Sequence, residues 1–273
     1  MSYSVVIPTF NSSSRIEESI ISVLKQSVPP VDIFVVDDCS DDINELQNVC
    51  KKYEIIKVIS KTVKSNAAHS RNIGWLESEA DYVLFLDSDD LWTPVHAEEC
   101  LKVFDENKEI MCVFGAFHIK ISPNAKGIKK TIGAFEENKK GYIFEGGNDF
   151  RTSTVAVRRK LYDFVHFDSS AKKHQDWDLY LSLIKSDSLV KQNKEPTVII
   201  NCYGGYRMSS ENNLDASFQF LSKWWDFLNS NSKSFIIFLL VKTAILSNKC
   251  EEIKEIRSRY YYFLIHESSI KLK

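Results

Sequence analysis

Three carboxylates follow one short apolar run of this sequence. Residues 82–86 read YVLFL, and Asp87, Asp89 and Asp90 come directly after them. Such a run is typical of a buried strand in an α/β sheet, which binds ligands at the carboxyl ends of its strands. Close carboxylates repel one another, and Mg²⁺ binds through one or two carboxylates together with substrate oxygens. The spacing predicts a divalent-cation site that carries a phosphate, with a solvated acidic turn as the alternative.

Two further apolar runs end in residues that are expected at the same edge of the sheet. The apolar run 32–36 ends in Asp37 and Asp38, and the first run ends in Pro8 and Thr9. Because parallel strands have their carboxyl ends at one edge of a sheet, these residues should meet the acids of the later run. The helix expected after Thr9 adds an N-terminus, which favours anions. Carboxylates, a cation and a helix N-terminus together suit a nucleoside diphosphate.

Strands and helices alternate four times over residues 1–107, which predicts a parallel sheet with helices on both faces. The predicted strands are 4–8, 32–36, 55–59 and 82–86, and the predicted helices are 16–26, 42–53, 66–78 and one that opens at Thr93 and Pro94. Ser14 and Glu17 have the spacing of a capping box, and Asn66 can cap its helix. The expected fold class is α/β.

In the second part of the chain the predicted strands and helices no longer alternate regularly. Strands are predicted at 111–119, 152–157 and 198–200, a helix at 174–185, and a loop-rich segment at 122–150. From Phe218 onward the sequence is helical in pattern, with apolar residues at helical spacing and basic and aromatic residues near the end. This tail predicts helices that pack on the main domain or on a second subunit, or an amphipathic surface resting on a membrane.

Composition narrows the class of protein. The 273 residues carry 35 Lys+Arg and 37 Asp+Glu, a net charge of −2 that gives no electrostatic case for nucleic acid as a partner. Six cysteines form no C-x-x-C pair, which suits a reducing compartment. No signal peptide and no run of roughly 18 apolar residues is visible. We therefore expect a cytoplasmic protein, with peripheral contact to the inner face of the membrane as an option.

Four motifs in this order resemble glycosyltransferase family 2. They are IPTFN at 7–11, VDDCS at 36–40, SRNIG at 70–74 and LDSDD at 86–90. The resemblance covers about residues 3–210 and implies the GT-A fold, with a mainly parallel central sheet flanked by helices. It also implies an inverting sugar transferase that uses a nucleotide-sugar donor, a UDP-sugar above all, and Mg²⁺ or Mn²⁺.

The resemblance assigns donor and metal roles to particular positions. Thr9 and Asp38 would contact the base, with Pro8 in the same motif and Arg71 nearby. Asp87, Ser88 and Asp89 would form the D-x-D motif, in which Asp89 ligates the metal and Asp87 lies near the ribose or the metal. Arg207 falls in the segment that can close over the diphosphate. Thr9 could instead cap the entry to a helix, and Arg71 could be a surface arginine.

A later acid is needed for the chemistry that the resemblance implies. Inversion is a single displacement, so a base must take the acceptor proton on the face opposite the departing diphosphate. Asp176 occupies the family's place for that general base, with Gln175 where glutamate is commoner. Asp178 is the alternative base, and Asp176 could simply cap its helix. Trp92 and Trp177 could stack on sugar rings or pack in the core.

The resemblance implies that the chain has three parts, and it implies particular binding partners. Residues 1–107 would bind the nucleotide sugar, 108–217 would bind the acceptor, and 218–273 would form a helical extension. The acceptor would be a glycan or a polyprenyl-diphosphate-linked saccharide of bacterial surface polysaccharide assembly, such as O-antigen or capsule. A homodimer or membrane contact through 218–273 is also expected.

Three other classes fit the sequence less well. A phosphatase with an aspartate nucleophile carries its D-x-D after the first strand, whereas here the motif follows the fourth. A sugar-1-phosphate nucleotidyltransferase needs a glycine-rich basic loop after the first strand, and TFNS at 9–12 is neither. A degenerate domain that serves as a binding or scaffold subunit has no need of intact acids at Asp38, Asp87, Asp89 and Asp176.

Overall fold

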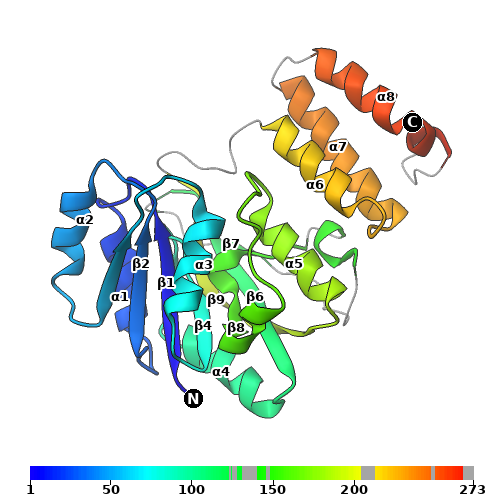
Figure 1. Ribbon diagram of the computed structural model, residues 1–273. Coiled ribbons are helices and arrows are strands. Elements are labelled where there is room, and N and C mark those ends of the chain that lie inside the picture. Colours follow the sequence, from blue (N-terminus) through cyan, green and yellow to red (C-terminus); the bar gives the residue numbers. More distant parts are fainter. Residues whose placement is uncertain are drawn as a thin grey trace.

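The computed structural model describes most of the chain. The described residues are 1–122, 124, 128–130, 140–145, 148–203, 213–246 and 250–266. They form an α/β layer with a mixed central sheet and a group of three C-terminal helices beside it, as Figure 1 shows.

The first half of the sheet is parallel. Its strands are β1 (Tyr3–Thr9), β2 (Asp32–Asp37), β3 (Ile56–Ser60) and β4 (Tyr82–Phe85), in the order β3-β2-β1-β4. The four predicted strands are thus confirmed within a residue or two at each end. Their carboxyl ends lie at one edge because all three pairings are parallel.

The second half of the sheet is mixed. Here β8 (Ala156–Arg158) pairs with β4 and with β6 (Ile110–Lys120) in antiparallel fashion, and β9 (Leu189–Asn201) runs parallel to β6. Two short strands, β5 (Leu91–Trp92) and β7 (Ile128–Lys130), pair with β9 and β6. Two predictions were wrong in extent. Thr152–Thr154 forms a 3₁₀ turn (η2) before β8, and the strand predicted at 198–200 is the end of the long β9.

Alternation along the strands gives the sheet an apolar core on each face. On β1, Val5 and Ile7 pack with α1 (Ile16–Leu24), α2 (Ile43–Cys50) and α4 (His96–Glu106). Val6 points to the other face, toward α3 (Ala67–Glu77) and α5 (Gln175–Lys185). A Cβ on Gly74 would lie 2.5 Å from a methyl carbon of Val6, so only glycine lets α3 approach β1 this closely.

Helix starts explain where the capping predictions succeeded and failed. Asn66 caps α3 as predicted, and its side chain accepts a hydrogen bond from His69 N at 3.0 Å. The predicted capping box at Ser14 was wrong, because the backbone turns at the Ser12 carbonyl and α1 begins later without a side-chain cap. Thr93 caps nothing with its side chain; its carbonyl accepts from His96 N, and α4 begins there.

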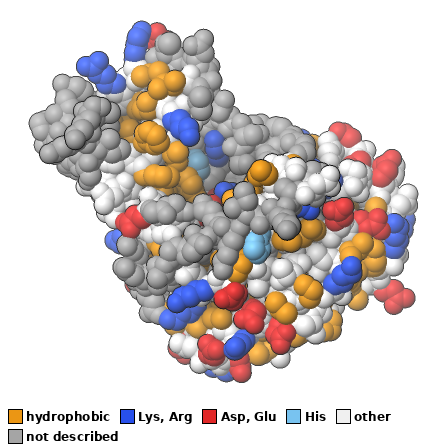
Figure 2. Space-filling model, turned by 180° about the vertical axis from the view of Figure 1, so that it is seen from behind, with side chains coloured by type: hydrophobic (Ala, Val, Ile, Leu, Met, Phe, Trp, Pro, Cys, Tyr) orange, Lys and Arg blue, Asp and Glu red, His pale blue; other side chains and the backbone are white. Residues whose placement is uncertain are grey.

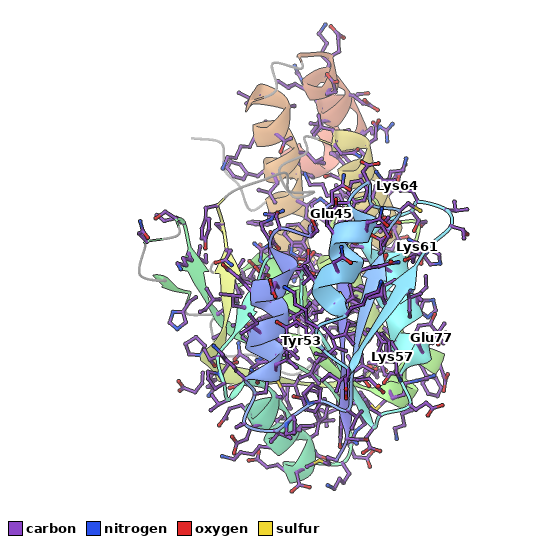
Figure 3. All side chains as sticks on the ribbon, turned by 90° about the vertical axis from the view of Figure 1, so that its left-hand side faces the viewer. Glu45, Tyr53, Lys57, Lys61, Lys64 and Glu77 are labelled. Carbon is purple, nitrogen blue, oxygen red and sulfur yellow. The ribbon has the colours of Figure 1, made fainter. Side chains whose placement is uncertain are left out.

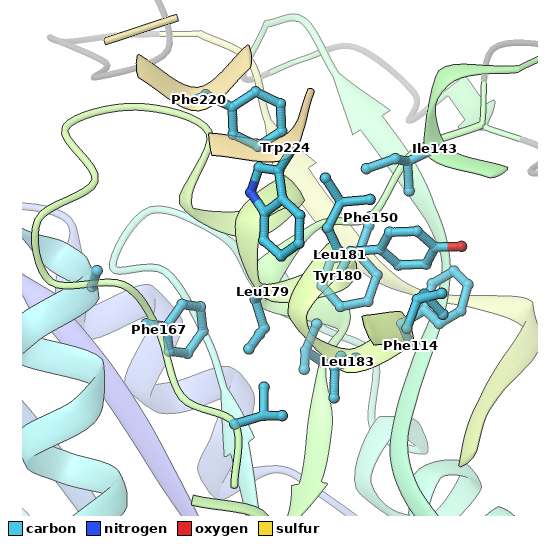
Figure 4. Packing of buried hydrophobic residues seen from close by; sticks show 14 of the residues in the cluster. Phe114, Ile143, Phe150, Phe167, Leu179, Tyr180, Leu181, Leu183, Phe220 and Trp224 are labelled. Carbon is cyan, nitrogen blue, oxygen red and sulfur yellow. The ribbon is translucent and has the colours of Figure 1, made fainter. Parts of the chain in front are cut away.

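The tail forms three helices next to α5. They are α6 (Leu214–Trp224), α7 (Ser230–Leu246) and α8 (Cys250–His266), grouped at the upper right of Figure 1. The predicted boundary at 217 falls inside α6. Their apolar residues join the core cluster that covers the α3 and α5 face of the sheet, and Figure 4 shows Phe220 and Trp224 above Leu179 of α5. No helix of the described residues is long and apolar enough to cross a membrane.

Candidate active site

The carboxyl edge of the parallel half-sheet gathers the residues expected to meet a donor. Pro8 and Thr9 end β1, where Thr9 pairs with Asp37 of β2 and its carbonyl accepts from Asp38 N at 2.9 Å. All four residues are buried. The Thr9 hydroxyl caps no described helix, and among the described residues it has no hydrogen-bond partner. The sheet therefore brings Thr9 and Asp38 together as predicted.

Asp38 is held by residues that no motif indicated. Its Oδ1 accepts from Lys61 Nζ at 2.6 Å and from Ser65 N at 2.8 Å. Both charged side chains are nearly buried, 5% exposed for Lys61 and 9% for Asp38. Lys61 also donates to the hydroxyls of Ser65 and Ser70. The signal that could have found Lys61 is its position directly after the third strand, at the same edge as the acids.

Arg71 joins the D-x-D turn to the start of α5. Its Nη2 donates to Asp87 Oδ1 at 2.6 Å, and its Nη1 donates to Gln175 Oε1 at 3.1 Å. The side chain is only 6% exposed and lies over the Phe167 ring, so it is not a surface arginine. Gln175 in turn donates to the Ala171 carbonyl at 2.8 Å, which fixes its orientation. This relay of hydrogen bonds, from Asp87 through Arg71 to Gln175, places the first turn of α5, including Asp176, beside the D-x-D turn.

The D-x-D residues differ in how the protein engages them. Asp87 forms a short ion pair with Arg71 and is 36% exposed, whereas Asp89 is 25% exposed and its Oδ2 lies 3.8 Å from Arg15 Nη1. Ser88 donates to Ser12 Oγ at 3.2 Å, so the turn contacts the loop after β1. Asp87 and Asp89 are the residues here that could supply carboxylate oxygens to a divalent cation, which usually completes its coordination with water or substrate oxygens. Within the described residues no group of three or more His, Cys, Asp or Glu forms a complete metal cage.

Asp90 is a buried structural acid beneath this turn. It accepts from Ser153 Oγ at 2.6 Å and from Asn201 N at 3.0 Å, and Asn201 Nδ2 donates to the Asp89 carbonyl at 2.6 Å. Burial, with repulsion from Asp87 and Asp89, raises the pKa of Asp90 well above its usual range. Asp90 therefore ties the end of β4 to η2 and to the end of β9, and sets the course of the D-x-D turn.

Asp176 occupies the first turn of α5 in a half-buried position. Its Oδ1 accepts from Trp177 N at 2.9 Å, a local bond in the first turn of the helix. Burial raises the pKa of Asp176 to about 6; the attraction of Arg151 opposes this rise and the repulsion of Asp149 adds to it. Arg151 Nε binds Asp149 Oδ2 at 2.8 Å. A carboxylate with a pKa near 6 can accept a proton at neutral pH.

Asp178 turns away from Asp176 and toward α6. Its Oδ1 accepts from Trp224 Nε1 at 2.8 Å and lies 2.7 Å from Lys223 Nζ, and its side chain is only 3% exposed. Lys223 also binds Asp168 Oδ2 at 2.6 Å. These contacts give Asp178 a structural role that links α5 to α6.

The aromatic residues near the acids pack in the core. Trp92 is 4% exposed and donates to the Ser153 carbonyl, as expected for core packing. Trp177 contacts Phe220 of α6 and stacks on His174, whose ring lies 4.6 Å away and whose Nε2 lies 2.8 Å from Ser217 Oγ. Burial and the nearby Lys173 lower the pKa of His174 to about 3. Trp177 is only partly buried, so its stacking on a sugar stays a prediction, and Arg207 lies outside the described residues.

The fold and the family of the chain follow from comparison with known proteins. The crystal structure of S. aureus TarS 1–349 in complex with UDP-GlcNAc has the same GT-A architecture, with a TM-score of 0.63 at 19% identity over 100% of this chain and 76% of that chain. The chain belongs to glycosyltransferase family 2, whose model, described as glycosyl transferase family 2, matches residues 4–165.

Two curated relatives give the range of similarity. Amylovoran biosynthesis glycosyltransferase AmsB of Erwinia amylovora is 30% identical over 205 residues, which is 69% of this chain and 65% of AmsB. Poly(ribitol-phosphate) beta-N-acetylglucosaminyltransferase TarP of Staphylococcus aureus is 38% identical over 209 residues, 72% of this chain and 62% of TarP. In both cases the matched part spans less than two thirds of the relative.

Proposed function

We propose that this chain is an inverting, metal-dependent glycosyltransferase that moves one sugar from a nucleotide-sugar donor to a hydroxyl of a glycan acceptor. The observation that carries the proposal is the relay from Asp87 through Arg71 to Gln175. It brings an acid of a separate segment, Asp176, beside the D-x-D turn. A single displacement needs this arrangement, since the base and the leaving diphosphate act on opposite faces of the sugar.

Asp176 is the proposed general base. A base must be ionised to take a proton and must still hold that proton in the transition state, which a pKa near the working pH allows. The pKa of about 6 meets both conditions at neutral pH. Burial is the main cause of this raised pKa, and the neighbouring Arg151 and Asp149 shift it in opposite directions.

The carboxyl edge is the proposed donor site. Asp89 would hold Mn²⁺ or Mg²⁺, with Asp87 nearby, and the bound ion would neutralise charge on the diphosphate. The residues proposed to bind the donor are Pro8, Thr9, Asp38, Arg71, Asp87, Ser88 and Arg207. A uridine nucleotide is favoured because the TarS structure of the same fold was solved with UDP-GlcNAc.

The acceptor is proposed to be a bacterial surface glycan. The curated relatives are named for amylovoran and for poly(ribitol-phosphate), both polymers. Residues 1–107 would form the donor half and 108–217 the acceptor half, with 218–273 as a helical extension. Exposed Phe238 and Ile245 on α7 support peripheral contact with the inner face of the membrane, where a polyprenyl-diphosphate-linked acceptor would lie. Figure 2 shows apolar and basic side chains together on this part of the molecule.

Calorimetric titration with UDP, GDP, CDP and dTDP, each with and without Mn²⁺, tests the donor site. We expect metal-dependent binding of UDP to the wild type, its loss in Asp89→Asn, and its retention in Asp176→Asn together with loss of sugar transfer. Asp105→Asn is the matched control, because this exposed acid of α4 lies outside the proposed site. Failure of all four nucleotides to bind would contradict the donor site, and transfer at the wild-type rate by Asp176→Asn would contradict the base.

A further inference from the structure

Lys61 is placed where a residue can govern the choice of nucleobase. It follows β3 at the carboxyl edge, and Figure 3 shows Lys61 and Lys64 at that end of the strand with Lys57 toward the other. Its ammonium lies 2.6 Å from Asp38 Oδ1, and both side chains are more than nine-tenths buried. Burying both charges costs desolvation free energy, and the attraction between them need not compensate for that cost. A functional role for this ion pair is therefore worth testing.

The contacts of Asp38 leave it one oxygen for a ligand. Oδ1 takes two donors, Lys61 Nζ and Ser65 N. No donor to Oδ2 is found among the described residues. A carboxylate oxygen accepts hydrogen bonds but donates none. The free oxygen of Asp38 is therefore an acceptor.

An acceptor at this position discriminates between bases by their ring nitrogens. Uracil and thymine carry an N–H at N3, and guanine carries one at N1. Cytosine has an unprotonated N3 that can only accept. A carboxylate facing that nitrogen would be left with two acceptors opposed, which costs binding because both groups are desolvated without a partner.

We propose that Lys61 is a specificity-determining residue of the donor site, which holds Asp38 as an acceptor so that bases with a ring N–H bind and cytosine is rejected. This inference rests on the proposed function. Lys61 does not contact the base in this account; it acts through Asp38. Without Lys61 the carboxylate keeps only Ser65 N as a donor to Oδ1 and is freer to turn, so its hydrogen bond to a ring N–H weakens, whereas cytosine has no such bond to lose.

Calorimetric titration with UDP and with CDP, in the presence of Mn²⁺, tests the proposal on the full-length protein. We expect wild type to bind UDP at least about tenfold more tightly than CDP, the usual effect of one hydrogen bond to a charged group. Lys61→Met should lower this ratio by up to about tenfold, mainly through weaker binding of UDP. Lys61→Arg keeps the charge and should keep most of the ratio. A purely structural role would weaken both nucleotides equally.

Lys57→Met is the matched control, since Lys57 lies on β3 in an exposed ion pair with Asp32 and should leave the ratio unchanged. If Lys61→Met does not fold, Lys61→Gln replaces it, with the same direction of change expected. An unchanged ratio in a folded Lys61 variant overturns the proposal while the donor site stands. Equal binding of CDP and UDP by wild type also overturns it. Absence of any nucleotide binding to wild type overturns the proposed function as well.

Discussion

Asp176→Asn should stabilise the protein while it abolishes sugar transfer. The pKa of Asp176 lies above its ordinary value because burial disfavours the ionised carboxylate. Asparagine resembles the protonated form in shape and neutrality, and its Oδ1 can still accept from Trp177 N. The substitution therefore removes the cost of keeping a charge in this position.

The size of the gain follows from the pKa. A rise from 3.8 to about 6 corresponds to at most about 3 kcal/mol at 1.4 kcal/mol per factor of ten in proton affinity. Since Asp176 keeps some contact with solvent, we expect about 1–3 kcal/mol at neutral pH. That raises Tm by several degrees, at about 2–4 °C per kcal/mol for a chain of this size.

The gain should depend on pH in a defined way. Below the unfolded pKa near 3.8 the wild-type residue is protonated in both states, so wild type and Asp176→Asn should have the same stability. Between pH 4 and 6 the native state holds the proton more firmly, and the variant gains progressively. Above pH 6 its advantage is complete. Thermal melts of both proteins from pH 4 to 8 measure the difference, and kcat of wild type should rise to a plateau over the same interval.

Asp178→Asn is the matched control, with the same change two residues along the same helix. Asp178 binds Lys223 and Trp224 of α6, so loss of its charge should destabilise the protein by about 1–3 kcal/mol. The two variants thus have opposite expected signs. A lower Tm for Asp176→Asn at pH 8, or a gain that is as large at pH 4, would refute the reasoning about the buried carboxylate.

Two further results are expected. Trp224→Phe keeps the aromatic packing but removes the indole N–H that donates to Asp178. Thermal melts should therefore show a loss of about 1 kcal/mol in the free energy of unfolding, and kcat should fall more than donor affinity. An unchanged Tm would contradict this expectation. Flotation with anionic liposomes should carry part of the full-length protein upward, and Phe238→Ser with Ile245→Ser should prevent it. Protein that stays wholly in the soluble fraction would count against membrane contact.

Much of the fold could be predicted because local patterns and tertiary packing agree in the first half of the chain. The apolar runs of β1, β2 and β4 are buried along nearly their whole length, and α3 begins at the predicted cap residue Asn66. The proximity of Thr9, Asp38 and Asp87 could be predicted because parallel strands have their carboxyl ends at the same edge of a sheet.

The contacts that the sequence did not predict join segments that are distant along the chain. Asp90 meets Asn201 across 111 positions, and Arg71 meets Gln175 across 104, which no local spacing reports. Lys61 lies beside Asp38 because β2 and β3 are neighbours in the sheet and end at the same edge, although the two residues are far apart in sequence. The short η2 turn and the long β9 were misjudged because pairing with β6 and β8, not intrinsic propensity, sets their limits.

The contacts between α5 and α6 bear on how this chain can be recombined with its relatives. The family model ends at residue 165, ahead of α5, whereas Asp178 of α5 takes its charged partner and its indole donor from α6. A chimera that joins residues 1–165 to the C-terminal part of a relative should therefore take α5 and α6 from one parent. A junction placed between them would leave the buried carboxylate of Asp178 without its cation, so the two helices have to be exchanged as a pair.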